Sequence, residues 1–95
     1  MKSKTEDADL QEAEFVNTNL GAARFRDVNL AGAEFVDVSL VDARFTDVSF
    51  ARAVICDANF SGASIENANY DGMRIDGIPV TELLRVYRER APQRD

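Results

Sequence analysis

A large apolar residue stands at every fifth position of this chain, from residue 10 to residue 75, without a break in phase. The position two residues earlier is small or apolar throughout the same stretch, from Ala8 to Met73. A period of five fits neither the 3.6-residue turn of a helix nor the two-residue alternation of a flat strand. It indicates a chain that turns a corner once in each pentad, with the small and the large residue both directed inward.

Twenty residues form the complete structural period, because outward positions also repeat at that spacing. The triplet Ala13-Glu14-Phe15 returns as Ala33-Glu34-Phe35. The triplet Ala23-Arg24-Phe25 returns as Ala43-Arg44-Phe45. Four pentads then close one square coil, so residues 8–77 predict a stack of about 3.5 coils. The expected fold class is an all-β solenoid, a four-sided parallel β-helix.

Residues twenty positions apart should stack as ladders inside this coil, where burial of large apolar side chains is the main favourable term for folding. The expected ladders are Leu10, Leu30, Phe50 and Tyr70; Phe15, Phe35, Ile55 and Ile75; Leu20, Leu40 and Phe60; and Phe25, Phe45 and Ile65.

Beyond residue 77 the periodicity changes to that of a helix. Apolar residues follow the spacing i, i+3, i+4 and i+7 of one amphipathic face, at Val80, Leu83, Leu84 and Tyr87. We expect a helix over residues 81–90, with Thr81 as its N-cap, lying across the open coil end as a cap. The chain then divides into a flexible segment at 1–7, the solenoid at 8–77, and the capping helix and tail at 78–95.

Within the pentads, the pattern Ala-Asp/Asn-Leu/Phe recurs as Ala8-Asp9-Leu10, Ala58-Asn59-Phe60 and Ala68-Asn69-Tyr70. In this pattern the chain resembles the pentapeptide-repeat protein family, as a small member with a C-terminal helix. The resemblance implies a right-handed quadrilateral β-helix. It also implies a narrow set of functions: some larger members protect or inhibit DNA gyrase by imitating DNA, and many members have no assigned role.

The residues that catalysis usually needs are missing or isolated. The chain has no histidine, and its single cysteine, Cys56, has no evident base to activate it. Its carboxylates belong to the convex sides of the coil rather than to a cleft. We therefore expect no enzyme activity, no catalytic residues, no metal site and no cofactor.

Charge and hydropathy narrow the expected partners and location. A net charge of −6 argues against direct nucleic-acid binding through phosphates. No stretch holds the roughly 18 apolar residues that a membrane span requires. The start of the chain lacks the apolar core of a signal peptide, and a single cysteine fits a reducing compartment. We expect a cytoplasmic protein that binds another protein and no membrane.

One side of the coil is the candidate interface, because it directs apolar residues outward beside acidic ones, which is rare on a soluble monomer. This side carries Phe15, Phe35 and Ile55 inside. Its outward candidates are Val16, Val36, Val54, Cys56, Glu14, Glu34, Asp37 and Asp57. Since β-branched residues also favour strand geometry, these valines have a purely structural interpretation as well.

A solenoid this short has large ends relative to its interior, which favours self-association. We expect a homodimer joined at the N-terminal ends around Leu10, with the side strip or the helix as alternative contacts. Two functions remain open: a non-catalytic protein-interaction or scaffold module, and a DNA-mimicking modulator of DNA gyrase or another topoisomerase. Arginines such as Arg24 and Arg44 favour the first, because they interrupt a continuous acidic surface.

Overall fold

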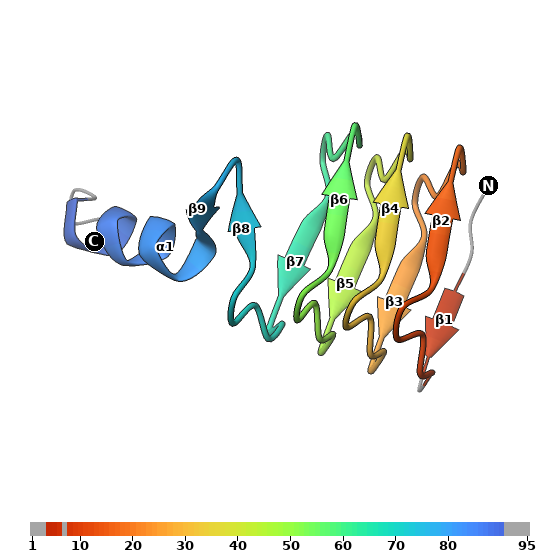
Figure 1. The fold of residues 1–95 in the computed structure, drawn as a ribbon, viewed down its shortest axis with the longest axis horizontal. Helices are drawn as coiled ribbons and strands as arrows, with labels where there is room; N and C mark the ends of the chain where they lie inside the picture. Colours follow the sequence, from red (N-terminus) through yellow and green to blue (C-terminus); the bar gives the residue numbers. More distant parts are fainter. Residues whose placement is uncertain (1–3, 7, 91–95) are drawn as a thin grey trace.

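The computed structural model describes residues 4–6 and 8–90, which wind into coils stacked along the long axis of the molecule (Figure 1). The strands are β1 (Lys4–Glu6), β2 (Glu14–Val16), β3 (Arg24–Arg26), β4 (Glu34–Val36), β5 (Arg44–Thr46), β6 (Val54–Cys56), β7 (Ser64–Glu66), β8 (Arg74–Ile75) and β9 (Ile78–Pro79), and the helix is α1 (Val80–Arg90). In β3, β4 and β5 the middle residue is buried, as the pentad phase predicts.

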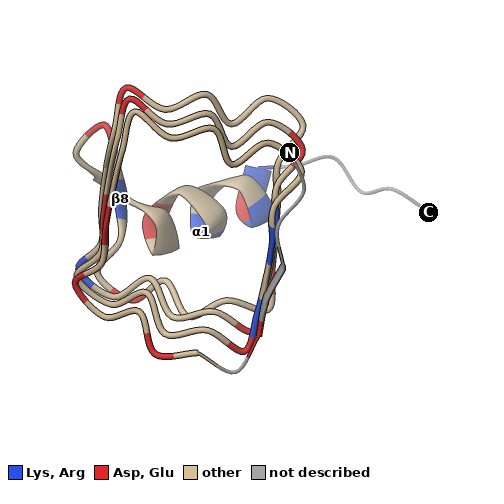
Figure 2. Cartoon of the chain, turned by 90° about the vertical axis from the view of Figure 1, so that its right-hand side faces the viewer, with Lys and Arg blue, Asp and Glu red and all other residues tan. Residues whose placement is uncertain are grey.

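Two parallel sheets form opposite sides of the square outline seen in Figure 2, with strand orders β1-β3-β5-β7 and β2-β4-β6. Paired strands are twenty residues apart. Phe15 pairs with Phe35 in one sheet. Phe25 pairs with Phe45 in the other. The structure thus confirms the predicted fold class, a four-sided parallel β-helix with twenty residues in each coil.

The two remaining sides consist of isolated parallel bridges followed by turns. A polar residue precedes each large apolar residue there, and its side chain can hold the turn. The Asn29 side-chain oxygen accepts a hydrogen bond from the Ala31 N–H at 3.0 Å. The Asn59 side-chain oxygen accepts one from the Ser61 N–H at 2.9 Å. These local Asx turns explain the Asp/Asn preference at the second position of the repeat.

Every fifth residue from Glu12 to Gly77 forms a corner with a positive φ, between 51° and 83°. This is the left-handed region, which glycine, asparagine and aspartate tolerate best. Most corners carry one of these three residues, whereas Glu12, Ala22 and Arg52 adopt the same conformation at a steric cost. Each pentad therefore specifies the residue at the corner as well as the small and the large residue that point inward.

The core lies in the middle coils. Its large residues are at most 3% exposed: Phe25, Val28, Leu30, Phe35, Val38, Leu40, Phe45, Val48 and Phe50. The rings of Phe25 and Phe45 stack with centroids 4.9 Å apart and planes within 3°. Residues of the end coils, such as Leu10 and Phe60, pack against this core but remain partly exposed. The predicted ladders form here because each coil covers the one before it.

At the N-terminal end, the solenoid begins earlier than the sequence predicts. Although residues 1–7 read as a flexible segment, Lys4–Glu6 form β1 and pair in parallel with Arg24–Arg26. Pairing of this kind uses backbone groups, so it does not require the large apolar residue that this pentad lacks at Thr5. Residues 1–3 and 7 lie outside the described residues.

At the C-terminal end, β8 departs from the predicted coil. The phase predicts that Ile75 stacks on Ile55, but β8 pairs antiparallel with β9, and Ile75 lies opposite Ile78. Asp76 and Gly77 both have positive φ, 51° and 83°, and form the two-residue turn of this hairpin. The β2-β4-β6 sheet therefore ends at β6.

The helix α1 stands at the C-terminal end of the solenoid, where a cap is predicted, but it leaves the coil end open. It starts at Val80, so Thr81 lies inside the helix and is not the N-cap. No residue of α1 is buried, and its main packing contact is with β9. The hairpin carries α1 away from the last coil, along the long axis of the molecule (Figure 1).

Candidate functional site

The predicted side strip lies on the β2-β4-β6 sheet, but the strand register divides it into two columns. Val16, Val36 and Cys56 follow one another in one column. Val54 lies in the other column, beside Glu34. Val16 and Val54 are 51% and 49% exposed. A continuous strip of three valines therefore does not form on this side.

The acidic candidates accompany these two columns. Glu14 and Glu34 are direct neighbours in register, in the column of Val54. Asp37 and Asp57 are corner residues with a φ of 53°. All four side chains are exposed. The left-handed conformation gives the two aspartates a structural reason to occupy their positions.

Leu10, the candidate at the N-terminal end, is partly buried and packs against the core. Its N–H donates to the Asn29 carbonyl at 2.8 Å, which ties the first coil to the second. Because β1 also pairs with β3 at this end, the first coil has more cover than the sequence predicts.

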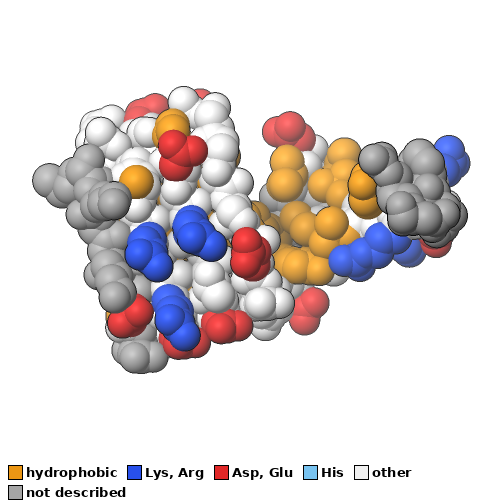
Figure 3. Space-filling model, turned by 180° about the vertical axis from the view of Figure 1, so that it is seen from behind, with side chains coloured by type: hydrophobic (Ala, Val, Ile, Leu, Met, Phe, Trp, Pro, Cys, Tyr) orange, Lys and Arg blue, Asp and Glu red, His pale blue; other side chains and the backbone are white. Residues whose placement is uncertain are grey.

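Basic side chains gather on the β1-β3-β5-β7 sheet (Figure 3), where Arg24 and Arg44 are direct neighbours in register. At the end of β3, Arg26 Nε lies 4.0 Å from Asp27 Oδ2 in an exposed ion pair. A shallow hollow of about 280 Å³ is lined by Glu6, Arg24, Phe25, Arg26, Arg44, Thr46, Asp47 and Glu66. Its mixed charges select no single class of ligand.

A larger and more apolar hollow, about 580 Å³, opens at the C-terminal end of the coils. We call it the C-terminal hollow. It is lined by Ala53, Ile55, Asp57, Ala58, Phe60, Ala63, Ile65, Met73, Arg74, Ile75 and Asp76. Since Ile55 and Ile75 are the ladder partners that fail to meet, the hollow lies where β8 would have continued the coil.

Exposed apolar side chains surround this hollow and continue onto α1 (Figure 3). They are 37% to 69% exposed: Ile65, Ile75, Ile78, Leu83, Val86 and Tyr87. A contiguous apolar surface of this kind usually marks an interaction site on a soluble protein. The C-terminal end is therefore a stronger candidate surface than either column of the side strip.

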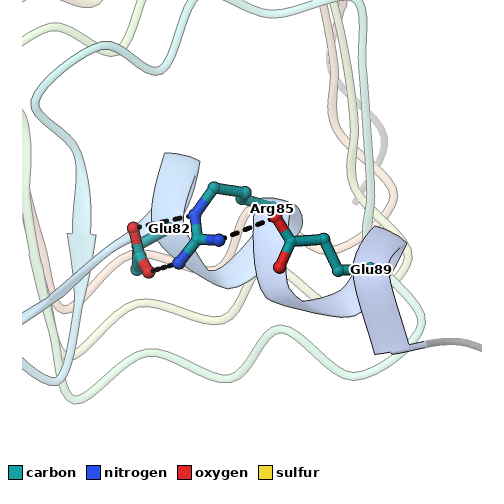
Figure 4. Close-up of polar contacts among 3 residues, drawn as sticks. All are labelled: Glu82, Arg85 and Glu89. Carbon is teal, nitrogen blue, oxygen red and sulfur yellow. Dashed lines mark hydrogen bonds and ion pairs between the residues drawn. The ribbon is translucent and has the colours of Figure 1, made fainter.

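Ion pairs along α1 stabilise a helix that buries none of its own residues. Arg85 donates to Glu82 through Nη2 and through Nε at 3.3 Å, and to Glu89 through Nη1 at 2.8 Å (Figure 4). The hydrogen bond from Arg85 lowers the pKa of the Glu82 carboxyl, and the two carboxylates raise the pKa of Arg85. Pairs at i,i+3 and i,i+4 support an exposed helix, and Arg88 and Arg90 in the last turn complement its dipole.

The described residues contain few groups suited to chemistry. Residues 4–6 and 8–90 hold no group of three or more His, Cys, Asp or Glu side chains placed to bind a metal ion. Cys56 is exposed and is not in a disulfide. None of the described helical segments has the length and apolar character needed to cross a membrane.

The coil geometry and the sequence comparison agree on a family. Pentapeptide repeats match residues 6–40 and 33–69, in 8 copies. The chain belongs to the pentapeptide-repeat family. No curated protein matches it. In this pentapeptide-repeat protein the matched region ends at residue 69, close to the point where the hairpin leaves the coils.

The C-terminal surface was not predicted from the sequence, although the chain contains a signal for it. Asp-Gly between two apolar positions is a strong indicator of a two-residue hairpin, and here Asp76-Gly77 lies between Ile75 and Ile78. The uninterrupted pentad phase through Ile75 pointed to a continued coil instead.

Proposed function

We propose that this pentapeptide-repeat protein is a non-catalytic protein-interaction module that docks through its apolar C-terminal end, and that it forms a homodimer there. The observation that carries the proposal is the joint exposure, on one chain, of the C-terminal hollow and the apolar residues of α1. Neither covers the other, because the hairpin separates α1 from the coils.

A second copy of the chain is the occupant that fits both surfaces at once. In a symmetric dimer, each α1 would lie against the open coil end of the other protomer, so that the same contact occurs twice. Leu83 and Val86 would then leave water, together with the walls of the hollow around Ile55 and Phe60. Burial of apolar area is the main driving force for such an association.

The charges of the two surfaces favour the same arrangement. Three arginines, Arg85, Arg88 and Arg90, stand against two glutamates in α1. The hollow, in contrast, is lined by two aspartates, Asp57 and Asp76, and one arginine, Arg74, so its lining is net negative. A basic helix end placed near an acidic coil end steers the two protomers into register.

The N-terminal end, which the sequence favours for dimerisation, is the weaker alternative. Leu10 is partly buried there, and β1 satisfies part of the sheet edge. Each end has two edge strands, β1 and β2 at one and β6 and β7 at the other, but Ile65 and Ile75 are exposed only beside β6 and β7. Unpaired strand edges next to exposed apolar side chains favour association.

Sedimentation across a concentration series tests the proposal with a matched pair of variants. Val86→Glu alters an α1 residue that is 39% exposed, whereas Val16→Glu makes the same change at a side-strip residue that is 51% exposed. We expect the native chain and Val16→Glu to dimerise, and Val86→Glu to remain monomeric. A native chain that stays monomeric at tens of micromolar contradicts the proposal. A dimer broken by Leu10→Glu but not by Val86→Glu would place the interface at the N-terminal end.

A further inference from the structure

Residues 73–79 combine two structural preferences that exclude each other, one for a further coil and one for a hairpin. Ile75 keeps the phase of the inward ladder, twenty residues after Ile55. Asp76-Gly77, however, is a preferred turn for a hairpin, and that hairpin pairs Ile75 with Ile78. A segment whose local preference opposes the global repeat is expected to have two arrangements of similar free energy.

The local turn that closes each pentad is still formed at Met73. The Met73 N–H donates to the Tyr70 carbonyl at 2.9 Å, as the Ala53 N–H donates to the Phe50 carbonyl at 3.0 Å one coil earlier. Within residues 8–90 the cross-coil hydrogen bonds end at Asn69, whose carbonyl accepts from the Phe50 N–H at 3.2 Å, and β8 does not pair with β6. Asp76, with a φ of 51°, then forms the hairpin turn. Among the described residues, Asp76 is the one with a positive φ that does not stand at the corner position of a pentad.

The observed hairpin is short and largely exposed, although the Val80 N–H extends its pairing by donating to the Met73 carbonyl at 2.9 Å. Its strands β8 and β9 have two residues each, and Ile75 and Ile78 remain 52% and 46% exposed. A two-stranded hairpin without a packed face is marginal in water. Its apolar residues would be better covered on the open coil end.

The coil end, in turn, has groups ready to accept β8. The Asn17 N–H donates to the Val36 carbonyl at 3.0 Å, and the Asp37 N–H donates to the Cys56 carbonyl at 3.1 Å. One coil further on, the Asp57 N–H has no backbone acceptor among residues 4–6 and 8–90. By the same register its acceptor would be the carbonyl of Asp76.

We propose that residues 73–77 are a strap with two states, which opens and closes the C-terminal hollow. In the open state, β8 pairs with β9 and the hollow is accessible, as observed. In the closed state, β8 pairs in parallel with β6, Ile75 lies on Ile55, and the hollow is filled. Closure makes the C-terminal end inaccessible to a partner, and this regulatory consequence rests on the proposed function.

The native Cys56 allows a direct test of the closed pairing. Asp76→Cys introduces a second thiol twenty residues later, which the closed state places next to Cys56 on the neighbouring strand. Strands about 4.8 Å apart lie within the Cα separation that a disulfide spans. Arg74→Cys is the matched control, because the in-register neighbour of position 74 is position 54, two residues along the strand from Cys56.

Both variants are treated with a mild thiol oxidant at low protein concentration, and the loss of two hydrogens within one chain is followed by mass spectrometry. We expect the intramolecular disulfide to form about tenfold faster in Asp76→Cys than in Arg74→Cys, given the geometric demands of the bond. Equal rates, or disulfides between chains alone, would overturn the strap.

Backbone amide exchange provides a second measurement without a cross-link. Asp76→Val removes a residue that tolerates positive φ, whereas Asp76→Asn keeps one that does. We expect the Asp57 amide to exchange several-fold more slowly in Asp76→Val than in Asp76→Asn, because closure gives its N–H an acceptor. Equal exchange rates in the two variants would also count against the strap.

The outcomes separate the strap from the proposed dimer. If the cross-link and the protection of Asp57 appear while every variant is monomeric, the strap holds and the dimer proposal fails. If the native chain dimerises and neither signal appears, the dimer holds and the strap fails. If both the strap and the dimer are correct, the oxidised Asp76→Cys variant is monomeric, because its hollow is closed, and reduction of the disulfide restores the dimer.

Discussion

The ring of Phe15 stacks on that of Phe35, with centroids 4.7 Å apart and planes within 8°, yet the two residues differ in burial. Phe35 is 0% exposed, whereas Phe15 is only partly buried. β2 is an edge strand, so the coil that contains Phe35 covers Phe15 on one face alone. Each coil therefore depends on the next one for its cover, and stability should follow position in the stack.

Phe35→Ala is expected to lower the free energy of unfolding by about 3–5 kcal/mol, the cost of truncating a buried aromatic side chain. Phe15→Ala makes the same chemical change at an end coil and should cost about half as much, because less area leaves water. Denaturant unfolding of both variants measures the difference. Equal losses would show that the N-terminal coil is as well covered as the middle of the stack.

Arg52→Gly is expected to stabilise the protein by about 0.5–1 kcal/mol. Arg52 is a corner residue with a φ of 58°, and glycine adopts this conformation without the steric cost borne by other residues. Part of that gain is lost to the greater freedom of glycine in the unfolded chain. Arg52→Ala removes the same charge but keeps the strain, so it is the control. If both variants have the same midpoint of thermal unfolding, corner strain is not a significant cost in this fold.

The helix α1 should lose stability as the pH falls below the ordinary pKa of a glutamate. Because Arg85 lowers the pKa of Glu82, the ion pair contributes fully above the unfolded value, about 4.3 for glutamate, and is lost as the pH falls through the lowered folded value. Amide chemical shifts of α1 report this transition. In Glu82→Gln, the part of the transition that belongs to this pair should disappear, and an unchanged acid midpoint would contradict the assignment.

At micromolar concentration, the protein is expected to leave DNA supercoiling by gyrase unchanged. A DNA mimic needs a continuous acidic surface, and the neighbouring arginines Arg24 and Arg44 interrupt it on one sheet. A supercoiling assay measures this directly. Strong inhibition that disappears on charge reversal at Glu14 and Glu34 would instead support the DNA-mimicking function.

Much of the candidate surface was beyond prediction from the sequence, for a reason that the side strip illustrates. Pentad phase correctly gives Val16, Val36 and Val54 as outward residues, but it does not by itself show that Val54 stands one column away, beside Glu34. Val54 lies two positions before Cys56 along β6, so its side chain also points outward but belongs to the other column. The apolar surface of α1 was predicted as a buried face, since its spacing is the same whether or not a partner covers it.

The sequence alone determined the interior of the solenoid, because in a repeat fold each coil contacts only its neighbours and the same contacts recur every twenty residues. Phe25, Phe35 and Phe45 are buried as their phase requires. Only the tertiary structure decided the C-terminal end, where no further coil holds β8 in place. There a local turn at Asp76-Gly77 competes with pairing to a single strand, β6, and the hairpin prevails. The open hollow and the exposed helix follow from that hairpin. The five-residue phase specifies which residues can stack, but stacking also requires a neighbouring coil.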